Sequence, residues 1–443
     1  MVSFIETYKQ RTPGSAALYE RAARVMPGGV CHNPRFYPPY PVYLSRAEGS
    51  RIWDVDGNEY IDLWMGHYSH ILGHNPELLR TVIAETAAQG THWGIVHEHQ
   101  IAYAEDLCRV IPSVERVRFG VSGTEATMYA VRLARAYTGR KAILKVRGGW
   151  HGSGSELVKA VHSPMDIPES AGILPEVMEY TKTISFNDTE GTVAAIRQCG
   201  SDLAAVIIEA VGQNFVPPHP NYLETVQAET RKAGAVFILD EVITGGRLGP
   251  QGGQGLYGLS PDLTTMGKVL GGGMALGMVG GRKEIMDLAD PTRGLPKGRG
   301  VIMGGGTFSA MPPAMRAGKA IFNYLEEHAA DLYPSLQAKG ERVRTGVEEA
   351  FREVGISVRC FGVGSLYSVT FPKSEDADIY DIETIETRSD VRRRDHEFRL
   401  RMLNHGVYTM WGGGAISDAH SEEDLDRIIA AARAVAREMA AEQ

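Results

Sequence analysis

The sequence has 443 residues, of which 43% are hydrophobic and 23% are charged, and its formal net charge is −8. This size and composition are typical of a globular protein with a large core, organised in two or three domains. The acidic balance without a basic stripe argues against a nucleic-acid partner, and no apolar run reaches the roughly 18 residues of a membrane span. Four separated cysteines without a CxxC pair, and an N-terminus without an apolar signal region, predict a cytoplasmic protein.

Residues 1–62 predict an N-terminal segment that joins a smaller domain. The pattern over 4–26 is that of an amphipathic helix, interrupted at Pro13-Gly14. Residues 42–63 alternate apolar and polar side chains around Asp56-Gly57-Asn58, which favours a β-meander with a hairpin turn.

Residues 63–307 predict a large α/β domain. Helical patterns alternate with short β-branched runs that are typical of buried parallel strands, at 116–121, 142–146, 204–208 and 236–239. The glycine-rich stretch 294–306 predicts a loop that joins this domain to a smaller α+β domain over 308–443. That domain begins with a long helix near Met311 and includes strand-like pieces at 365–371 and 406–410.

Ser122-Gly123-Thr124-Glu125-Ala126 follows a predicted strand and opens a helix. The unpaired N–H groups and the dipole of a first helical turn attract a phosphate, and Gly123 permits close approach of the backbone. The alternative is an ordinary serine or threonine N-cap with a glutamate in the first turn.

Two further polar residues end apolar runs. Asp240 closes VFILD, where a carboxylate needs a partner such as the nitrogen of a pyridine ring, although a helix cap or loop cap is the alternative. Lys268 lies among small apolar residues, and burial would lower its pKa and make its amine a nucleophile. The alternative for Lys268 is a surface lysine with a buried stem.

Five motifs occur in a set order, SGTEA (122–126), GGWHG (148–152), DEVITGGR (240–247), TTMGK (264–268) and GGTFS (305–309). Together they resemble the class III aminotransferases, most of all the branch that contains glutamate-1-semialdehyde aminomutase. The resemblance runs from about Met26 to the C-terminus. It implies a pyridoxal-phosphate-dependent transferase of fold type I, similar to aspartate aminotransferase, with pyridoxal 5′-phosphate as cofactor and a homodimer whose sites lie at the subunit interface.

The resemblance also implies roles for single residues. Lys268 is similar to the lysine that forms a Schiff base with the cofactor and moves the proton, and Asp240 to the acid at the ring nitrogen. Val242 would pack on one ring face and Trp150, which stands where the family has tyrosine, on the other; a core tryptophan is the alternative. The remaining implied contacts are Ser122, Gly123 and Thr124 at the phosphate, Thr307 reaching it from the other subunit, His151 beside Trp150, and Glu209 as a second acid near Asp240.

Substrate residues follow from the same resemblance. Arg35 stands where the aminomutase binds the substrate carboxylate, and a surface arginine is the alternative. His67, with Tyr68, and Trp93 fall on the expected pocket lining, where a core role is equally open. The loop Gly212–Phe215 lacks the glutamate of many family transaminases, and Trp411–Gly414 lacks both their mobile arginine and the glutamate of the aminomutase.

These features favour a ping-pong aminotransferase that moves an amino group from an amino acid or amine donor to an oxo-acid acceptor. An intramolecular aminomutase or a racemase is the second hypothesis, and a non-catalytic cofactor-binding module is the third. A cluster of histidines and one acid fits no zinc spacing, so we expect no metal at His92, His97, Glu98 and His99.

Overall fold

The computed structural model describes residues 3–304 and 306–442. These residues form two compact units: a large unit of Glu77–Pro334 and Ile379–Thr384, and a small unit of Met1–Pro76, Ser335–Asp378 and Ile385–Gln443. The limits differ from the expected ranges 63–307 and 308–443. The described residues of the expected joining loop, 294–304 and 306, lie inside the large unit, as does helix α12 (Pro312–Glu327).

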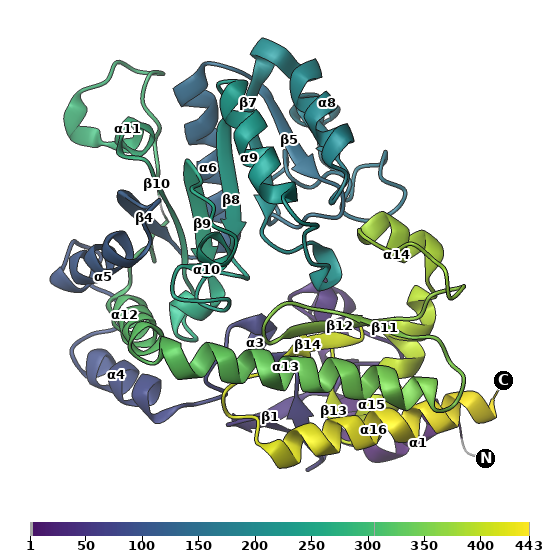
Figure 1. The fold of residues 1–443 in the computed structure, drawn as a ribbon. Coiled ribbons are helices and arrows are strands. Elements are labelled where there is room, and N and C mark those ends of the chain that lie inside the picture. Colours follow the sequence, from purple (N-terminus) through teal and green to yellow (C-terminus); the bar gives the residue numbers. More distant parts are fainter. Residues whose placement is uncertain (1–2, 305, 443) are drawn as a thin grey trace. The chain divides into compact units, whose positions relative to one another are not determined.

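A seven-stranded sheet forms the centre of the large unit (Figure 1). Five neighbouring strands are parallel, whereas β10 is antiparallel to both β9 and β4. The strands in spatial order are β4 (Arg116–Gly120), β10 (Gly277–Gly281), β9 (Leu263–Gly267), β8 (Val236–Glu241), β7 (Leu203–Glu209), β5 (Ala142–Val146) and β6 (Thr181–Ile184).

This mostly parallel sheet confirms the α/β fold class. The prediction that residues 116–121 form a buried parallel strand was wrong, because β4 pairs antiparallel with β10 and side chains along it are exposed. A β-branched run alone does not distinguish an edge strand from a central one.

Both faces of the large sheet are covered by helices. On one face, Ala130 and Leu133 of α6 (Gly123–Thr138) pack with Ile207 and Ile238. On the other face, Val226 of α9 (Tyr222–Lys232) packs with Ile208 and Leu239 of the same two strands, as expected for buried parallel strands. The other helices of this unit are α4 (Glu77–Ala88), α5 (Glu98–Val110), α7 (Pro175–Met178), α8 (Thr189–Cys199), α10 (Gly252–Leu256) and α11 (Lys283–Met286).

The ends of α6 follow from its sequence. Ser122 is the N-cap, and its side chain accepts a hydrogen bond from the backbone N–H of Glu125. Gly139 ends the helix at φ +68°, in the left-handed region that glycine adopts without strain. The helix therefore begins three residues after the last residue of β4, so its first turn lies at an edge of the sheet.

Two smaller sheets belong to the small unit. In the first, the hairpin of β2 and β3 turns at Gly57, and Asp54 accepts from the backbone N–H groups of Asp56 and Asn58. This confirms the meander expected over 42–63. The strands are β1 (Leu44–Glu48), β2 (Arg51–Asp54), β3 (Glu59–Asp62) and β13 (Val407–Tyr408) in one sheet, and β11 (Arg359–Phe361), β12 (Leu366–Thr370) and β14 (Gly413–Ala415) in the other.

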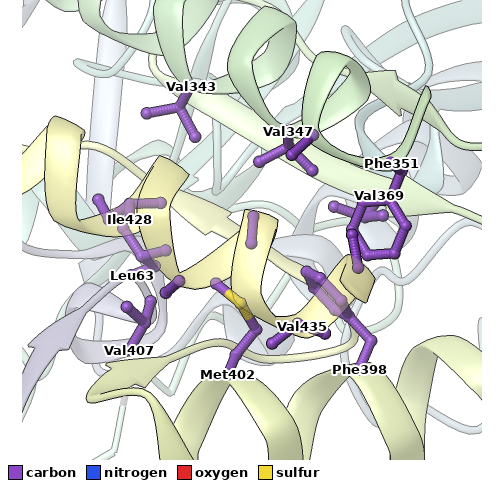
Figure 2. Packing of buried hydrophobic residues seen from close by; sticks show 14 of the residues in the cluster. Leu63, Val343, Val347, Phe351, Val369, Phe398, Met402, Val407, Ile428 and Val435 are labelled. Atoms are coloured by element: carbon purple, nitrogen blue, oxygen red, sulfur yellow. The ribbon is translucent and has the colours of Figure 1, made fainter. Parts of the chain in front are cut away.

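Helices complete the small unit around an apolar core (Figure 2). Val343 and Val347 of α13 contribute to this core together with Ile428 and Val435 of α16, which a Ser421–Asp424 capping box begins. None of the described helices is long and apolar enough to cross a membrane. The helices are α1 (Phe4–Arg11), α2 (Pro13–Ala23), α3 (Met65–Tyr68), α13 (Ala329–Arg352), α14 (Ile382–Arg388), α15 (Arg399–Asn404) and α16 (Glu422–Ala441), and the limit between the units falls within α13 and within α14.

Candidate active site

The predicted polar residues of the large unit meet at the carboxyl ends of three neighbouring parallel strands. Glu209 ends β7 and lies in register with Asp240 on β8, which in turn lies in register with Thr265 on β9. Lys268 directly follows β9. This is the edge at which open α/β sheets bind ligands.

Asp240 is a buried carboxylate with three donors. Its side chain is 4% exposed, and it accepts hydrogen bonds from His151 Nδ1 at 2.7 Å and from Thr265 Oγ1 at 2.9 Å. The backbone N–H of Val242 donates to it at 3.1 Å. Because a carboxylate only accepts hydrogen bonds, we place the ring proton of His151 on Nδ1. Asp240 is thus held in one orientation at the end of its strand.

His151 has a second nitrogen whose position suits a ligand. Its side chain is fully buried, and Nε2 has no hydrogen-bond partner among the described residues. A buried, unpaired ring nitrogen is costly, so it indicates an absent ligand or water. The sequence pointed to His151 through the GGWHG motif. Thr265 carried no separate signal, because its contact with Asp240 depends on the register of β8 and β9.

Lys268 combines a lowered pKa with a strained backbone. Desolvation lowers the pKa of its ammonium to about 8, against the opposing effect of Asp240 and Glu209. Its φ of +46° lies in the left-handed region, which non-glycine residues rarely adopt and which is frequent at functional sites. An amine with this pKa is partly neutral near pH 8 and therefore able to attack a carbonyl carbon.

The first turn of α6 brings together backbone N–H groups and the hydroxyl groups of Ser122 and Thr124. Ser122 is its N-cap, so the alternative interpretation of this motif is correct for that side chain, and Thr124 Oγ1 accepts from the N–H of Ser153 at 3.1 Å. A Cβ on Gly123 would lie 2.9 Å from a methyl group of Val242. The N-cap does not exclude an anion site in this turn, because capping leaves other N–H groups of the turn unpaired.

The segment carrying Trp150 and His151 is fixed against this first turn of α6. Thr127 Oγ1 of α6 donates to the carbonyl of His151 at 2.6 Å, and Gly152, at φ +83°, lies against Thr124. Trp150 is 41% exposed. That exposure contradicts a core role for Trp150 and leaves its ring free to stack on a ligand.

Glu209 connects this segment to a neighbouring turn. It accepts from the backbone N–H of Trp150 at 3.3 Å, and Gln213 Nε2 donates to both of its oxygens at 3.0 and 3.2 Å. Desolvation raises the pKa of Glu209. The role of Gln213 could not be predicted from the sequence, because only the fold turns this amide toward the acid.

The remaining predicted residues come from other segments of the chain. Arg35 and His67 belong to the small unit, where Arg35 is exposed and the ring of His67 lies 4.2 Å from that of Trp64. Trp93 and Thr307 belong to the large unit and are both exposed. Gly305 of the GGTFS motif lies outside the described residues. The roles of these four residues stay predictions.

No metal site accompanies these groups within 3–304 and 306–442, where no set of three or more histidine, cysteine or acidic side chains is arranged to hold an ion. In the histidine cluster, His97 Nε2 lies 2.8 Å from the carbonyl of Ala310, and the rings of His97 and His99 are 5.7 Å apart.

The cluster fits pyridoxal phosphate. Lys268 supplies an amine for its aldehyde, Asp240 a carboxylate for its ring nitrogen, and the first turn of α6 a cup for its phosphate. His151 Nε2 is a buried polar atom in need of a partner, and Gly123 leaves space beside Val242 that a side chain would fill.

Comparison with known proteins points to the same family. The family model described as "Aminotransferase class-III" matches residues 33–417. Glutamate-1-semialdehyde 2,1-aminomutase 2 of Lachnoclostridium phytofermentans is 38% identical over 93% of this chain and 96% of its own length. An omega-transaminase from Sphaerobacter thermophilus is 32% identical, with a TM-score of 0.88 over 97% of this chain and 99% of its own.

A further solved structure, described as a transaminase with PLP bound, is also 32% identical, with a TM-score of 0.86 over 97% of this chain and 99% of its own. The fold, the cluster at the strand ends and these similarities agree. The chain belongs to the class III aminotransferase family, and its cofactor is pyridoxal 5′-phosphate.

Proposed function

We propose that this protein is an aminotransferase that takes an amino group from an amino acid or amine and passes it to an oxo acid. The observation that carries the proposal is the buried set of Asp240, His151 and Thr265 beside an amine with a pKa of about 8. When bound, pyridoxal phosphate supplies an aldehyde that links to amines and a ring that withdraws electrons from the carbon next to the nitrogen.

Each residue has a stated part in this proposal. Asp240 holds a proton on the ring nitrogen, and His151 and Thr265 keep its carboxylate oriented. Lys268 would hold the cofactor through its aldehyde, and its free amine would serve as the base and acid that moves the proton of the substrate carbon next to the nitrogen. Trp150 and Val242 keep the ring between them, and Ser122, Gly123 and Thr124 hold the phosphate.

Transfer between two molecules is favoured over isomerisation by the segment Trp411–Gly414. By resemblance, the aminomutase carries a glutamate in this region, where this chain has glycine. The similarity to the omega-transaminase supports the same choice. We further propose that Arg35 binds a substrate carboxylate, that His67 and Trp93 line the substrate pocket, and that the protein acts as a homodimer in which Thr307 of the partner subunit reaches the phosphate.

The test is a screen of the purified holoenzyme with amino acid and amine donors against 2-oxo acid acceptors, with the aminated acceptor measured by mass spectrometry. We expect transfer that needs both partners and that is lost in Lys268→Ala. Absence of transfer across the panel, with the cofactor bound, would overturn the proposal.

Aminomutase activity is the second candidate, because relatives 36–39% identical to this chain are named glutamate-1-semialdehyde 2,1-aminomutase. It predicts that glutamate-1-semialdehyde is isomerised without any added acceptor. Isomerisation of this kind together with failed intermolecular transfer would replace the aminotransferase proposal.

A further inference from the structure

Lys145 is a buried cation that the proposed chemistry does not use. It lies on β5, and its side chain is 0% exposed. Neighbours on the strand show which way it points: Leu144 and Val146 pack with the core on the α9 face, whereas Ile143 packs with the core on the α6 face. By the alternation of a strand, Lys145 points to the α6 face.

The hydrogen bonds of Lys145 go to one loop. Its Nζ donates to the carbonyl of Gly149 at 2.9 Å and to the carbonyl of Lys159 at 2.6 Å. These carbonyls stand near the start and the end of the segment that carries Trp150 and His151. The backbone N–H of Gly148 donates to the carbonyl of Ala160 at 2.7 Å and closes the same loop.

An apolar side chain would fill this buried position at lower cost. Removing an ammonium from water is expensive, and here the hydrogen bonds go to neutral carbonyls and not to a carboxylate. Desolvation accordingly lowers the pKa of Lys145 to about 8. A costly group of this kind indicates a positional role, because it supplies hydrogen bonds to the carbonyls of residues 149 and 159, which lie outside the named helices and strands.

The loop connects Lys145 to the cofactor residues. Gly149, which Lys145 holds, directly precedes Trp150 and His151, and the latter donates to Asp240 at 2.7 Å. A Cβ on Gly149 would lie 3.0 Å from His151 Nε2, so the backbone that Lys145 fixes lies directly against that imidazole.

We infer that Lys145 is a positioning residue for the cofactor: by fixing both ends of the loop over 149–159, it sets the places of Trp150 and His151 against the ring. The inference rests on the placement of the cofactor at this cluster and not on the identity of the substrates. Lys145 contacts neither the reacting atoms nor the cofactor, and it acts through the loop.

The test is the rate at which the holoenzyme releases pyridoxal phosphate, measured as the loss of visible absorbance from the protein after gel filtration. We expect Lys145→Met to release the cofactor about tenfold faster than the unmodified protein, the effect of losing hydrogen bonds from a charged group. Lys159→Met is the matched control, because it removes a neighbouring lysine side chain and leaves the carbonyl that Lys145 binds. It should release the cofactor at nearly the unmodified rate.

A double-mutant cycle separates positioning from general loss of stability. If Lys145 acts through His151, the variant with both Lys145→Met and His151→Asn should release the cofactor little faster than the more affected single variant. Equal release from Lys145→Met and Lys159→Met, or single effects that multiply in the double variant, would overturn the inference. If Lys145→Met does not fold, Lys145→Gln, which keeps two N–H donors, takes its place in the same cycle. Cofactor release needs no amino donor, so failed transfer would overturn the proposed function alone.

Discussion

His151 and Asp240 come from a loop and a strand 89 residues apart, yet the imidazole Nδ1 lies 2.7 Å from the carboxylate Oδ2. Both side chains are buried, at 0% and 4% exposed. In such a setting a carboxylate is oriented by its donors and not by water, so its free lone pairs have a fixed direction. Asp240 is therefore prepared to hold a proton on a ring nitrogen without reorganisation when substrate binds.

The first prediction concerns this charge. Asp240→Asn keeps the size of the side chain and an oxygen for Thr265, but it removes the negative charge. We expect pyridoxal phosphate to bind still and the rate of the first half-reaction to fall by about 100-fold or more, because electrostatic stabilisation at a developing charge is lost. Stopped-flow absorbance at saturating donor measures this rate.

The control for Asp240→Asn is Asp262→Asn. Asp262 is a second buried aspartate, 3% exposed, which accepts from the backbone N–H of Phe237 and pairs with Arg282. Its replacement should lower stability and leave the rate per folded molecule nearly unchanged. An Asp240→Asn enzyme as fast as the Asp262→Asn enzyme would contradict the role given to Asp240.

The sequence was sufficient to predict the residues that end strands. Asp240 and Lys268 each follow an apolar run, and the carboxyl ends of parallel strands meet at one edge, so their proximity follows from the α/β pattern. Thr265 and Gln213 were not predicted. Their contacts depend on strand register and on the direction of one side chain, and neither leaves a periodic signal in the sequence.

The order of strands at the edge of the sheet was also beyond the sequence. Residues 116–121 alternate arginine with apolar residues, and β10, which follows β9 in the chain, takes the place beside β9 and runs antiparallel to it. Strand β4 therefore lies at the edge of the sheet, where β10 is its one strand neighbour among the described residues. The composition of a segment indicates how buried it is, whereas the place of a strand in a sheet also depends on how the segments between strands run.

The second prediction uses the lowered pKa of Lys268. Without cofactor, its amine should react with an acylating reagent at a rate that rises with pH and levels off above about 8, since the neutral amine is the reactive form. An ordinary lysine, with a pKa near 10.5, continues to gain reactivity well beyond that pH. Peptide mapping by mass spectrometry at a series of pH values measures both.

Bound pyridoxal phosphate should protect Lys268 from this reagent. The exposed Lys297, which the cofactor should not protect, serves as the internal reference. Equal reactivity of these two lysines at pH 8 in the protein without cofactor, or no protection by the cofactor, would count against the assignment of Lys268.

The third prediction concerns the space beside Val242. In Gly123→Ala, the new methyl group would lie 2.9 and 3.1 Å from the two methyl groups of Val242, so that side chain must move. Because Val242 is proposed to pack on the ring, we expect the affinity for pyridoxal phosphate to fall by about tenfold. Alanine otherwise favours a helix, so the unfolding midpoint of the protein without cofactor should not fall.

Equilibrium dialysis measures that affinity, and Gly154→Ala is the control. A methyl group on Gly154 would meet a single atom, the Glu156 carboxylate oxygen at 4.0 Å. Unchanged affinity in Gly123→Ala would show that the cofactor ring does not depend on Val242.

The last prediction is a loss of stability in acid that arises at His420. Its side chain is fully buried, Nδ1 accepts from the backbone N–H of Ser417 at 3.0 Å, and desolvation lowers the pKa of the imidazole to about 4. The unfolded chain, with a histidine pKa near 6.5, binds more protons between these two values, so the free energy of unfolding falls as pH drops from about 6.5 toward 4. The full effect is about 3 kcal/mol.

His420→Asn keeps an acceptor for Ser417 and cannot be protonated. Urea unfolding should therefore show this variant losing less stability between pH 7 and pH 4.5 than the unmodified protein. His328→Asn, at an exposed histidine, should leave the pH dependence unchanged, and parallel pH curves for the His420→Asn and unmodified proteins would show that another group causes the acid sensitivity.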